Sequence, residues 1–126
     1  MISHLDTQAM VWLSGGQVEK LPAAAQAAIE ESDVVVSPMV LLELAYLYKI
    51  KRIVKPPLAL LDELRHRIGL TVRDHSFAGV MHTALFEDWT RDPFDRVIVA
   101  HARSDGEARL VTSDSKIREH YSPAVW

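Results

Sequence analysis

The sequence predicts an α/β fold, a three-layer α/β/α sandwich around a central, mainly parallel sheet of four or five strands. Short apolar runs of strand length alternate with longer segments of helical character, several of which begin at proline. Strands that alternate with helices form parallel sheets whose crossover helices cover both faces. The length of 126 residues, 48% of them hydrophobic and 25% charged, predicts a single domain over residues 1–126.

The first half of the chain carries signals for two strands and three helices. The β-branched run "VVVS" at 34–37 is typical of a buried strand. Proline is tolerated in the first turn of a helix, so Pro22 and Pro38 mark two helix starts. Gly15 and Gly16 end an earlier short helix. In order, we expect a strand at 2–6, a helix at 7–13, a helix from Pro22, a strand at 34–37 and a helix from Pro38.

The second half continues the alternation of helices and strands. The segment "KPP" at 55–57 is typical of a loop between two helices, and its last proline begins the second helix. Pro93 and Gly106 delimit a later helix. In order, we expect a helix from Pro57, a strand at 70–72, a helix over 76–86, a helix from Pro93, a strand at 109–113, a helix over 113–121 and, as an option, an edge strand at 124–126.

Composition and missing motifs exclude several classes of protein. The absence of cysteine rules out disulfides, thiolate zinc sites and cysteine nucleophiles. No P-loop, GxSxG elbow or DxDx[TV] phosphatase motif occurs, and the six histidines form no HxH or HExxH pair that would favour zinc. No run of about 18 apolar residues predicts a membrane span, and the first residues do not have the pattern of a signal peptide. We therefore expect a soluble, cytoplasmic protein with no membrane partner.

The stretch "MVLLELAYLY" at 39–48 carries a single carboxylate, Glu43, among nine apolar or aromatic residues. An unpaired ion taken out of water costs several kcal/mol. No residue three or four positions away from Glu43 is a base. Either this helix face is exposed, or Glu43 faces a water-filled cleft or a bound cation.

Three further acids stand where the expected fold brings them to one edge of the sheet. Asp6 follows the first strand and Asp114 follows "LVTS", and the carboxyl ends of parallel strands share an edge. Asp95 lies in the first turn of a later helix. Together with Glu43 they form a set of oxygen ligands of the kind that Mg²⁺ and Mn²⁺ prefer. The alternatives are structural: a turn for Asp6 and a helix N-terminus for Asp114. For Asp95 the alternative is a helix cap shared with Asp92.

The net charge of −3 is unevenly distributed. Residues 1–48 hold one base and six acids, whereas residues 49–73 hold seven bases and two acids. Most bases of the second segment lie in "KIKRIVK", which is either a solvated helix end or a surface that faces phosphate. Its bases are Lys49, Lys51, Arg52 and Lys55.

Four blocks of the sequence resemble the acidic blocks of the PIN-domain ribonucleases, and most closely the VapC-type toxins of toxin–antitoxin pairs. They occur in the order of that family and span nearly the whole chain. The blocks are "LDTQAMVW" (5–12), "VSPMVLLELAYL" (36–47), "DPFDRVIVAHA" (92–102) and "LVTSD" (110–114).

The resemblance implies a site and also shows two departures from the family pattern. Many relatives have His-Arg before "DPFD", where this chain has Thr90 and Arg91, and many have Trp where this chain has Leu42. Neither departure removes an acid, but the first puts in doubt a substrate role for that loop. The implied metal-binding and catalytic acids are Asp6, Glu43, Asp95 and Asp114, with Thr112 and Ser113 as hydroxyl neighbours.

The implied function is Mg²⁺- or Mn²⁺-dependent endoribonuclease activity of a toxin. Asp6, Asp95 and Asp114 would be the main metal ligands, while Glu43 would hold a ligand water or a second ion. Arg96 either contacts phosphate or forms a salt bridge. The basic run that contains Lys49, Lys51, Arg52 and Lys55 would follow the RNA backbone. The alternative is a PIN-like module that binds RNA or protein without cutting.

The resemblance also implies protein partners. Toxins of this type form homodimers and are silenced by a small cognate antitoxin in an apolar groove near the cleft. The run "LAYLY" at 44–48 is a candidate part of this groove, although core packing of Leu44 and Leu47 is the alternative.

Overall fold

The computed structural model describes residues 1–16 and 18–126 of the chain. The helices and strands alternate nearly as the sequence predicts. In order they are β1 (Ile2–Leu5), α1 (Thr7–Ser14), the 3-10 helix η1 (Val18–Lys20), α2 (Ala23–Glu31), β2 (Asp33–Val36), α3 (Pro38–Lys49), α4 (Pro57–Ile68), β3 (Thr71–Val72), α5 (Phe77–Ala84), α6 (Pro93–Ser104), β4 (Arg109–Val111), α7 (Ser115–His120) and β5 (Ala124–Val125).

The strands form one sheet in the order β3-β2-β1-β4-β5, and each neighbouring pair is parallel. The prediction of a mainly parallel sheet is thus confirmed, and the optional strand at 124–126 is present at the edge as β5. The register of the central pair places Leu5 beside Val111. Consequently the residues that follow β1 and β4 leave the sheet side by side.

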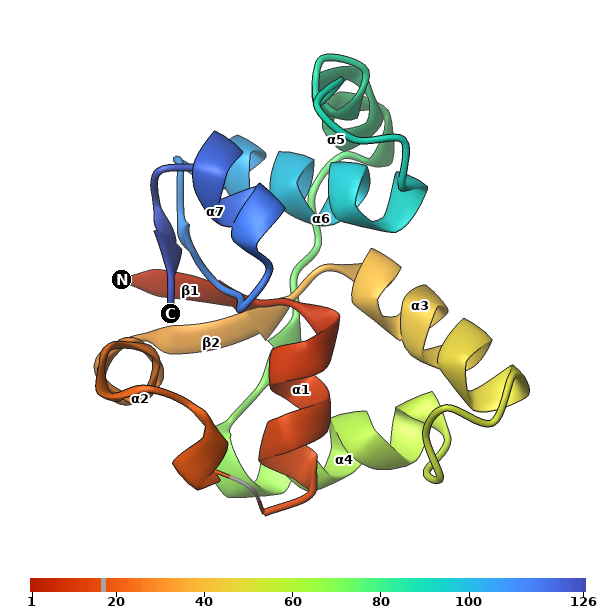
Figure 1. The fold of residues 1–126 in the computed structure, drawn as a ribbon, viewed down its shortest axis with the longest axis vertical. Helices are drawn as coiled ribbons and strands as arrows, with labels where there is room; N and C mark the ends of the chain where they lie inside the picture. The colour runs from red at the N-terminus through yellow and green to blue at the C-terminus, as the bar shows by residue number, and fades with distance from the viewer. Residues whose placement is uncertain (17) are drawn as a thin grey trace.

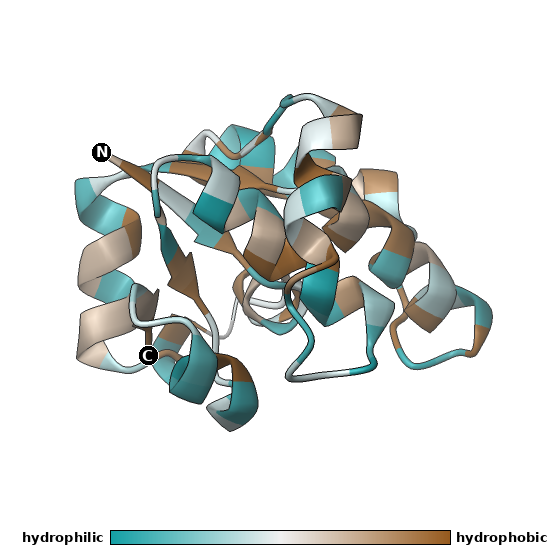
Figure 2. Ribbon diagram, turned by 90° about the horizontal axis from the view of Figure 1, so that it is seen from above, coloured by the Kyte–Doolittle hydropathy of each residue, from teal (hydrophilic) through white to brown (hydrophobic). Residues whose placement is uncertain are grey.

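Helices cover both faces of the sheet. Figure 1 shows α1, α2 and α4 on one side of the strands and α5, α6 and α7 on the other. The predicted strand "VVVS" is buried from Val34 to Ser37, and Leu110 and Val111 are fully buried beside β1. In Figure 2 the hydrophobic colour runs through the strands in the middle of the molecule. Burying one Val or Leu side chain in this core stabilises the fold by about 1.5–3 kcal/mol relative to leaving it exposed.

Short local signals fix the helix starts. Pro38, Pro57 and Pro93 occupy the first turns of α3, α4 and α6, where a missing N–H costs nothing. Pro22 instead directly precedes α2, which begins at Ala23. The sequence did not predict η1, and α5 ends at Ala84, two residues before the predicted end at Phe86.

In the described part of the chain, no helix has both the length and the apolar character needed to cross a membrane.

Candidate active site

The chain changes direction across the sheet between β1 and β4. From β1 it proceeds through β2 to β3 at one edge, and it then returns to place β4 and β5 on the other side of β1. In open parallel sheets, ligands bind beyond the carboxyl ends of the strands at such a switch point. Asp6 directly follows β1, and Asp114 follows β4 after two residues. Both acids therefore stand at the position where this architecture forms a crevice.

Asp6 is a buried acid, with 8% of its surface exposed. It is the N-cap of α1, and its Oδ1 accepts a hydrogen bond from the backbone N–H of Ala9 at 2.8 Å. Burial raises the pKa of Asp6 to about 6; a hydrogen bond from Thr112 opposes this rise, while the charges of Glu43 and Asp114 add to it. The pKa rise indicates a carboxylate without enough positive charge around it.

Thr112 links the two acids beside the switch point. Thr112 is fully buried, it lowers the pKa of Asp6, and its Oγ1 accepts the backbone N–H of Asp114 at 3.1 Å. Asp114 is the N-cap of α7, where its Oδ1 accepts the N–H groups of Lys116 and Ile117 at 2.8 and 3.1 Å. Within the described residues no hydrogen bond uses Oδ2 of Asp114, so this oxygen is available to a ligand.

Glu43 lies in the middle of α3 and is partly buried. Its Oε1 accepts a hydrogen bond from the hydroxyl of Thr7, the first residue of α1. Burial raises the pKa of Glu43, the Thr7 hydrogen bond opposes this, and the charge of Asp92 raises it further. Among the described residues, no Lys, Arg or His forms an ion pair with Glu43. The carboxylate predicted to be unusual is therefore unpaired.

The pKa of Asp95 is affected by the charges of all the other acids at the site. Burial raises its pKa to about 7, and the charges of the remaining acids act in the same direction. These acids are Asp92, Asp114, Glu43 and Asp6. Carboxylates from four separate segments of the chain thus lie within electrostatic reach of Asp95.

The chemistry of this donor set fits a hard divalent cation. All members are carboxylates, which are the ligands that Mg²⁺ and Mn²⁺ prefer. Among residues 1–16 and 18–126, however, no three His, Asp or Glu side chains already stand at metal-binding spacing.

Sequence reasoning missed two residues at this site. Thr7 follows Asp6 in "LDT", and its hydroxyl reaches the acid of a different block, Glu43. Asp92 was interpreted as a cap, and its Oδ1 does accept the N–H groups of Phe94 and Asp95 at 2.8 and 3.4 Å. Its charge nevertheless acts on both Glu43 and Asp95. The sequence feature that could have identified Thr7 as a site residue is its hydroxyl, next to an acid at the end of a strand.

The remaining predicted supporting residues lie around the acids. Ser113 is partly exposed between Thr112 and Asp114. Arg96 donates hydrogen bonds to the carbonyl oxygens of Ala84, at 3.1 and 3.2 Å, and Leu85, at 3.1 Å. The salt bridge considered as its alternative role is not among the ion pairs of the described residues.

The basic run lies at the far end of α3 and in the loop that follows. Lys49 is the last residue of α3, six residues or about 9 Å of helix beyond Glu43. Lys51, Arg52 and Lys55 are exposed, and Lys55 pairs with Glu63 at 2.7 Å. This surface is therefore adjacent to the acidic site without being part of it.

An apolar groove of about 420 Å³ separates α3, α5 and α6. Several of its lining side chains are unusually exposed for their type, including Leu42 at 58% and Phe77 at 79%. In the run "LAYLY", Leu44 is fully buried in the core, whereas Tyr46 is 53% exposed.

Comparison with known proteins gives a family and a structural relative. Residues 4–122 match the model of the PIN domain family. The fold is similar to a chain in the crystal structure of VapBC2 from Rickettsia felis bound to a DNA fragment from their promoter, with a TM-score of 0.67 and 20% sequence identity. The similarity covers 98% of this chain and 96% of that chain. No curated protein sequence matches this chain.

Proposed function

Because the chain belongs to the PIN domain family, whose model matches residues 4–122, we propose that it is a Mg²⁺- or Mn²⁺-dependent endoribonuclease. The observation that carries this proposal is Asp95, a partly buried carboxylate whose pKa is raised to about 7 by burial and by the charges of Asp92, Asp114, Glu43 and Asp6. Such a group of acids is stable only as protons bind to it or as a cation does. A metal-dependent nuclease site requires the bound cation.

Each residue has a distinct task in the proposed reaction. Asp6, Asp95 and Asp114 hold the cation, and Thr112 fixes the first and last of these relative to each other. When bound, the cation lowers the pKa of a water, polarises the phosphoryl oxygen and stabilises the leaving oxygen.

Glu43, on α3, would hold a ligand water of the cation and help to deprotonate the attacking water. The hydroxyl of Thr7 holds its carboxylate in place. The raised pKa of Glu43, caused first by burial, brings it closer to neutral pH and so suits it to accept a proton.

RNA is the proposed substrate despite the net charge of −3. Four of the 17 acids belong to the site, so the remaining acids are outnumbered by the 14 bases. The exposed side chains of Lys49, Lys51 and Arg52 would follow the phosphate backbone next to the site.

Cleavage of RNA tests the activity directly. We expect cleavage of a mixed RNA substrate with Mg²⁺ or Mn²⁺, and its loss with EDTA or in Asp95→Asn. Cleavage that survives both treatments would indicate contamination or a different mechanism. Absence of cleavage in every sample, with RNA still bound, would favour the non-catalytic binding module.

Metal binding is tested separately by thermal unfolding. Mg²⁺ or Mn²⁺ should raise the melting temperature of the wild type, and much less that of Glu43→Gln. Equal shifts in both proteins would remove Glu43 from the proposed site.

The toxin assignment and the partners are part of the same proposal. The structural relative comes from a complex named VapBC2, which supports a small cognate antitoxin as partner and the cytoplasm as location. We also propose a homodimer, since α5 and the two residues after it expose Phe77, Leu85 and Phe86 at 79%, 66% and 72%. Light scattering of the purified chain, with Phe77→Glu as comparison, should give a dimer for the wild type and a monomer for the variant.

A further inference from the structure

Glu87 is a buried acid outside the acidic site, with 4% of its surface exposed. It lies in the segment 85–92 between α5 and α6, here called the α5–α6 loop. This loop ends at Asp92, the N-cap of α6, and Asp95 follows in the first turn of that helix. The conformation of the loop therefore decides where α6 begins and where both acids point.

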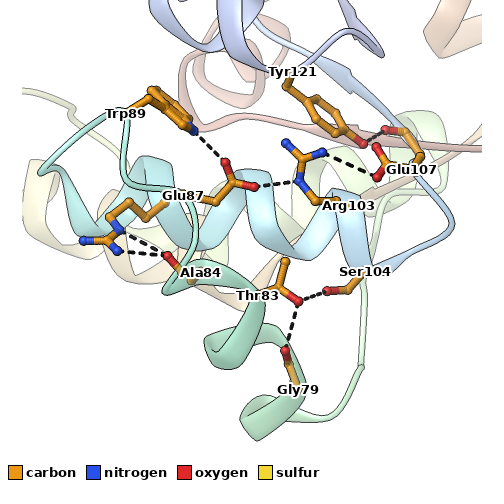
Figure 3. Close-up of polar contacts among 11 residues, drawn as sticks. Gly79, Thr83, Ala84, Glu87, Trp89, Arg103, Ser104, Glu107 and Tyr121 are labelled. Atoms are coloured by element: carbon orange, nitrogen blue, oxygen red, sulfur yellow. Dashed lines mark hydrogen bonds and ion pairs between the residues drawn. The ribbon is translucent and has the colours of Figure 1, made fainter.

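Both oxygens of Glu87 are used by partly buried partners (Figure 3). Oε1 accepts a hydrogen bond from Nε of Arg103 at 2.6 Å, and Oε2 accepts one from Nε1 of Trp89 at 2.6 Å. The partners are themselves fixed: Arg103 lies over the ring of Tyr121 at 5.0 Å, and Trp89 stacks on His120 at 5.0 Å. Glu87 thus ties the loop to the last turn of α6 and to the end of α7.

A second contact holds the start of the loop. Arg96, in the first turn of α6, donates to the carbonyl oxygens of Ala84 and Leu85. The loop is therefore attached to both ends of the helix that carries Asp95. Side chains in between, such as Phe86 at 72% exposure, contribute little burial that could replace these contacts.

We propose that Glu87 is a positioning residue, which fixes the α5–α6 loop so that α6 presents Asp95 and Asp92 to the cation. This inference rests on the proposed function. Glu87 does not touch the metal or the substrate in this scheme. It acts by holding the loop in one conformation, so that the acids lose less conformational freedom when the cation binds.

Glu87→Gln disrupts these contacts with a minimal change of side-chain shape. A carboxylate accepts through both oxygens, whereas an amide accepts through one and donates through the other. Either Arg103 or Trp89 then faces an N–H₂ group and loses its acceptor. The neighbouring exposed acid gives a matched control, because Asp88→Asn removes the same charge from the same loop without these contacts.

The expected result is a weaker affinity for Mn²⁺, measured by calorimetry on the full chain. We expect an increase in Kd of about 5-fold for Glu87→Gln, below the roughly 10- to 100-fold typical of groups that bond a metal ligand directly. Asp88→Asn should change Kd by less than about 2-fold. Leu64→Ala, a cavity in α4 on the far side of the molecule (Figure 1), controls for lost stability and should leave Kd unchanged.

A readout without metal accompanies the titration. In Glu87→Gln, amide hydrogen exchange should accelerate at Asp95 and Arg96, whose N–H groups are bonded to Asp92, and not in α4. Trp89→Phe, which removes only the bond to Oε2 and keeps an aromatic ring, provides a second variant with an intermediate effect if Glu87→Gln does not fold.

The outcomes separate the two proposals. Unchanged Kd and exchange in Glu87→Gln would overturn the positioning role and leave the nuclease proposal intact. An equal loss of affinity in Asp88→Asn would attribute the effect to charge and also overturn it. If the wild type binds no Mn²⁺, the proposed function fails first, and the positioning role fails with it.

Discussion

In two groups of buried and partly buried charged side chains, the acidic site and the cluster around Asp105, the pKa values of the acids shift in opposite directions. Asp105 follows α6, and its side chain is 8% exposed. It accepts two hydrogen bonds from Arg73, at 2.8 and 2.9 Å, and its Oδ2 lies 2.9 Å from Nε2 of His4. Burial alone would raise the pKa of Asp105, but the hydrogen bonds from Arg73 and His4 outweigh it and lower the pKa to about 2.

The difference separates an acid that stabilises the fold from acids that await a ligand. Asp105 has its positive partner inside the protein, so its charge is compensated whenever the chain is folded. Asp6 is buried and Asp95 is partly buried, and no ion pair of the described residues includes either; their pKa values rise to about 6 and about 7. Under the proposed function, a cation from solution supplies the positive charge that the acidic site lacks.

The largest expected effect is the loss of reaction in Asp95→Asn. We expect RNA cleavage to fall more than about 10³-fold, which corresponds to about 4 kcal/mol of transition-state stabilisation. The metal-free protein should become more stable at the same time, because one uncompensated charge is removed. Cleavage rates and urea unfolding without metal measure the two effects, and a variant that is both inactive and less stable would contradict the comparison.

Asp105→Asn should have the reverse profile. The substitution leaves Arg73 and His4 without a negative partner, and we expect a loss of about 2–4 kcal/mol in the free energy of unfolding. The affinity for Mn²⁺ should stay near the wild-type value under conditions where the variant is folded. Urea unfolding and calorimetry provide the two numbers; weaker metal binding with intact stability would show that the two groups are not separate.

The two groups also predict different dependences on pH. An acid with a higher pKa in the folded than in the unfolded protein binds more protons when folded, so its contribution to stability falls as pH rises. Asp6 and Asp95 should therefore weaken the metal-free fold between about pH 4 and about pH 7. Asp105, with its lowered pKa, contributes stability that is lost as pH falls below about 4.

The buried histidine His101 changes the stability of the fold with pH in the direction opposite to the acids and in the same pH range. Its contribution has to be separated from theirs. Burial lowers the pKa of His101 to about 4, so its contribution to stability rises with pH up to about 6.5. The useful measurement is therefore a difference. The stability of the wild type minus that of Asp95→Asn, from urea unfolding without metal, should decrease from about pH 4 to about pH 7. A constant difference would mean that Asp95 is not perturbed in the folded protein.

The smallest expected effect is that of Thr7→Val, which removes a hydroxyl and keeps the shape of a buried side chain. Without the hydrogen bond from Thr7, burial and the charge of Asp92 should raise the pKa of Glu43 further. We expect Mn²⁺ affinity at neutral pH to decrease about 3-fold, in keeping with the loss of one hydrogen bond to a charged group. Carbon-detected NMR titration of Glu43 provides the pKa directly, and a downward shift would rule out this role for Thr7.

Local signals were sufficient to predict most of the fold. The β-branched run at 34–37 and the prolines at 38, 57 and 93 act on their own neighbourhood, so the sequence reveals them directly. The order of strands in the sheet was not predicted, since it depends on which packed arrangement of helices is lowest in free energy. The pairing of His4 with Asp105, 101 residues apart, was not predicted for the same reason.

Within the candidate site, the sequence proposes the acids but not the contacts that the structure gives them. The sequence places Asp6 and Asp114 after strands, and the rule of parallel sheets then brings them to one edge. The bond from Thr7 to Glu43 depends on how α1 and α3 cross, and the role of Asp92 depends on a charge that its capping bonds do not neutralise. The buried Glu87 gave no signal, because its partners Trp89 and Arg103 are ordinary residues at unremarkable positions in the sequence.

The helix caps have a consequence for reading similar chains. Asp6, Asp92 and Asp114 each begin a helix, and replacing such a cap costs about 1 kcal/mol whether or not RNA is ever cut. A descendant that had abandoned catalysis would thus still be selected to retain these three. Glu43 caps no helix and forms no ion pair in the described chain. Under the proposed function, its replacement would therefore be the earliest sign that a related protein no longer binds a cation.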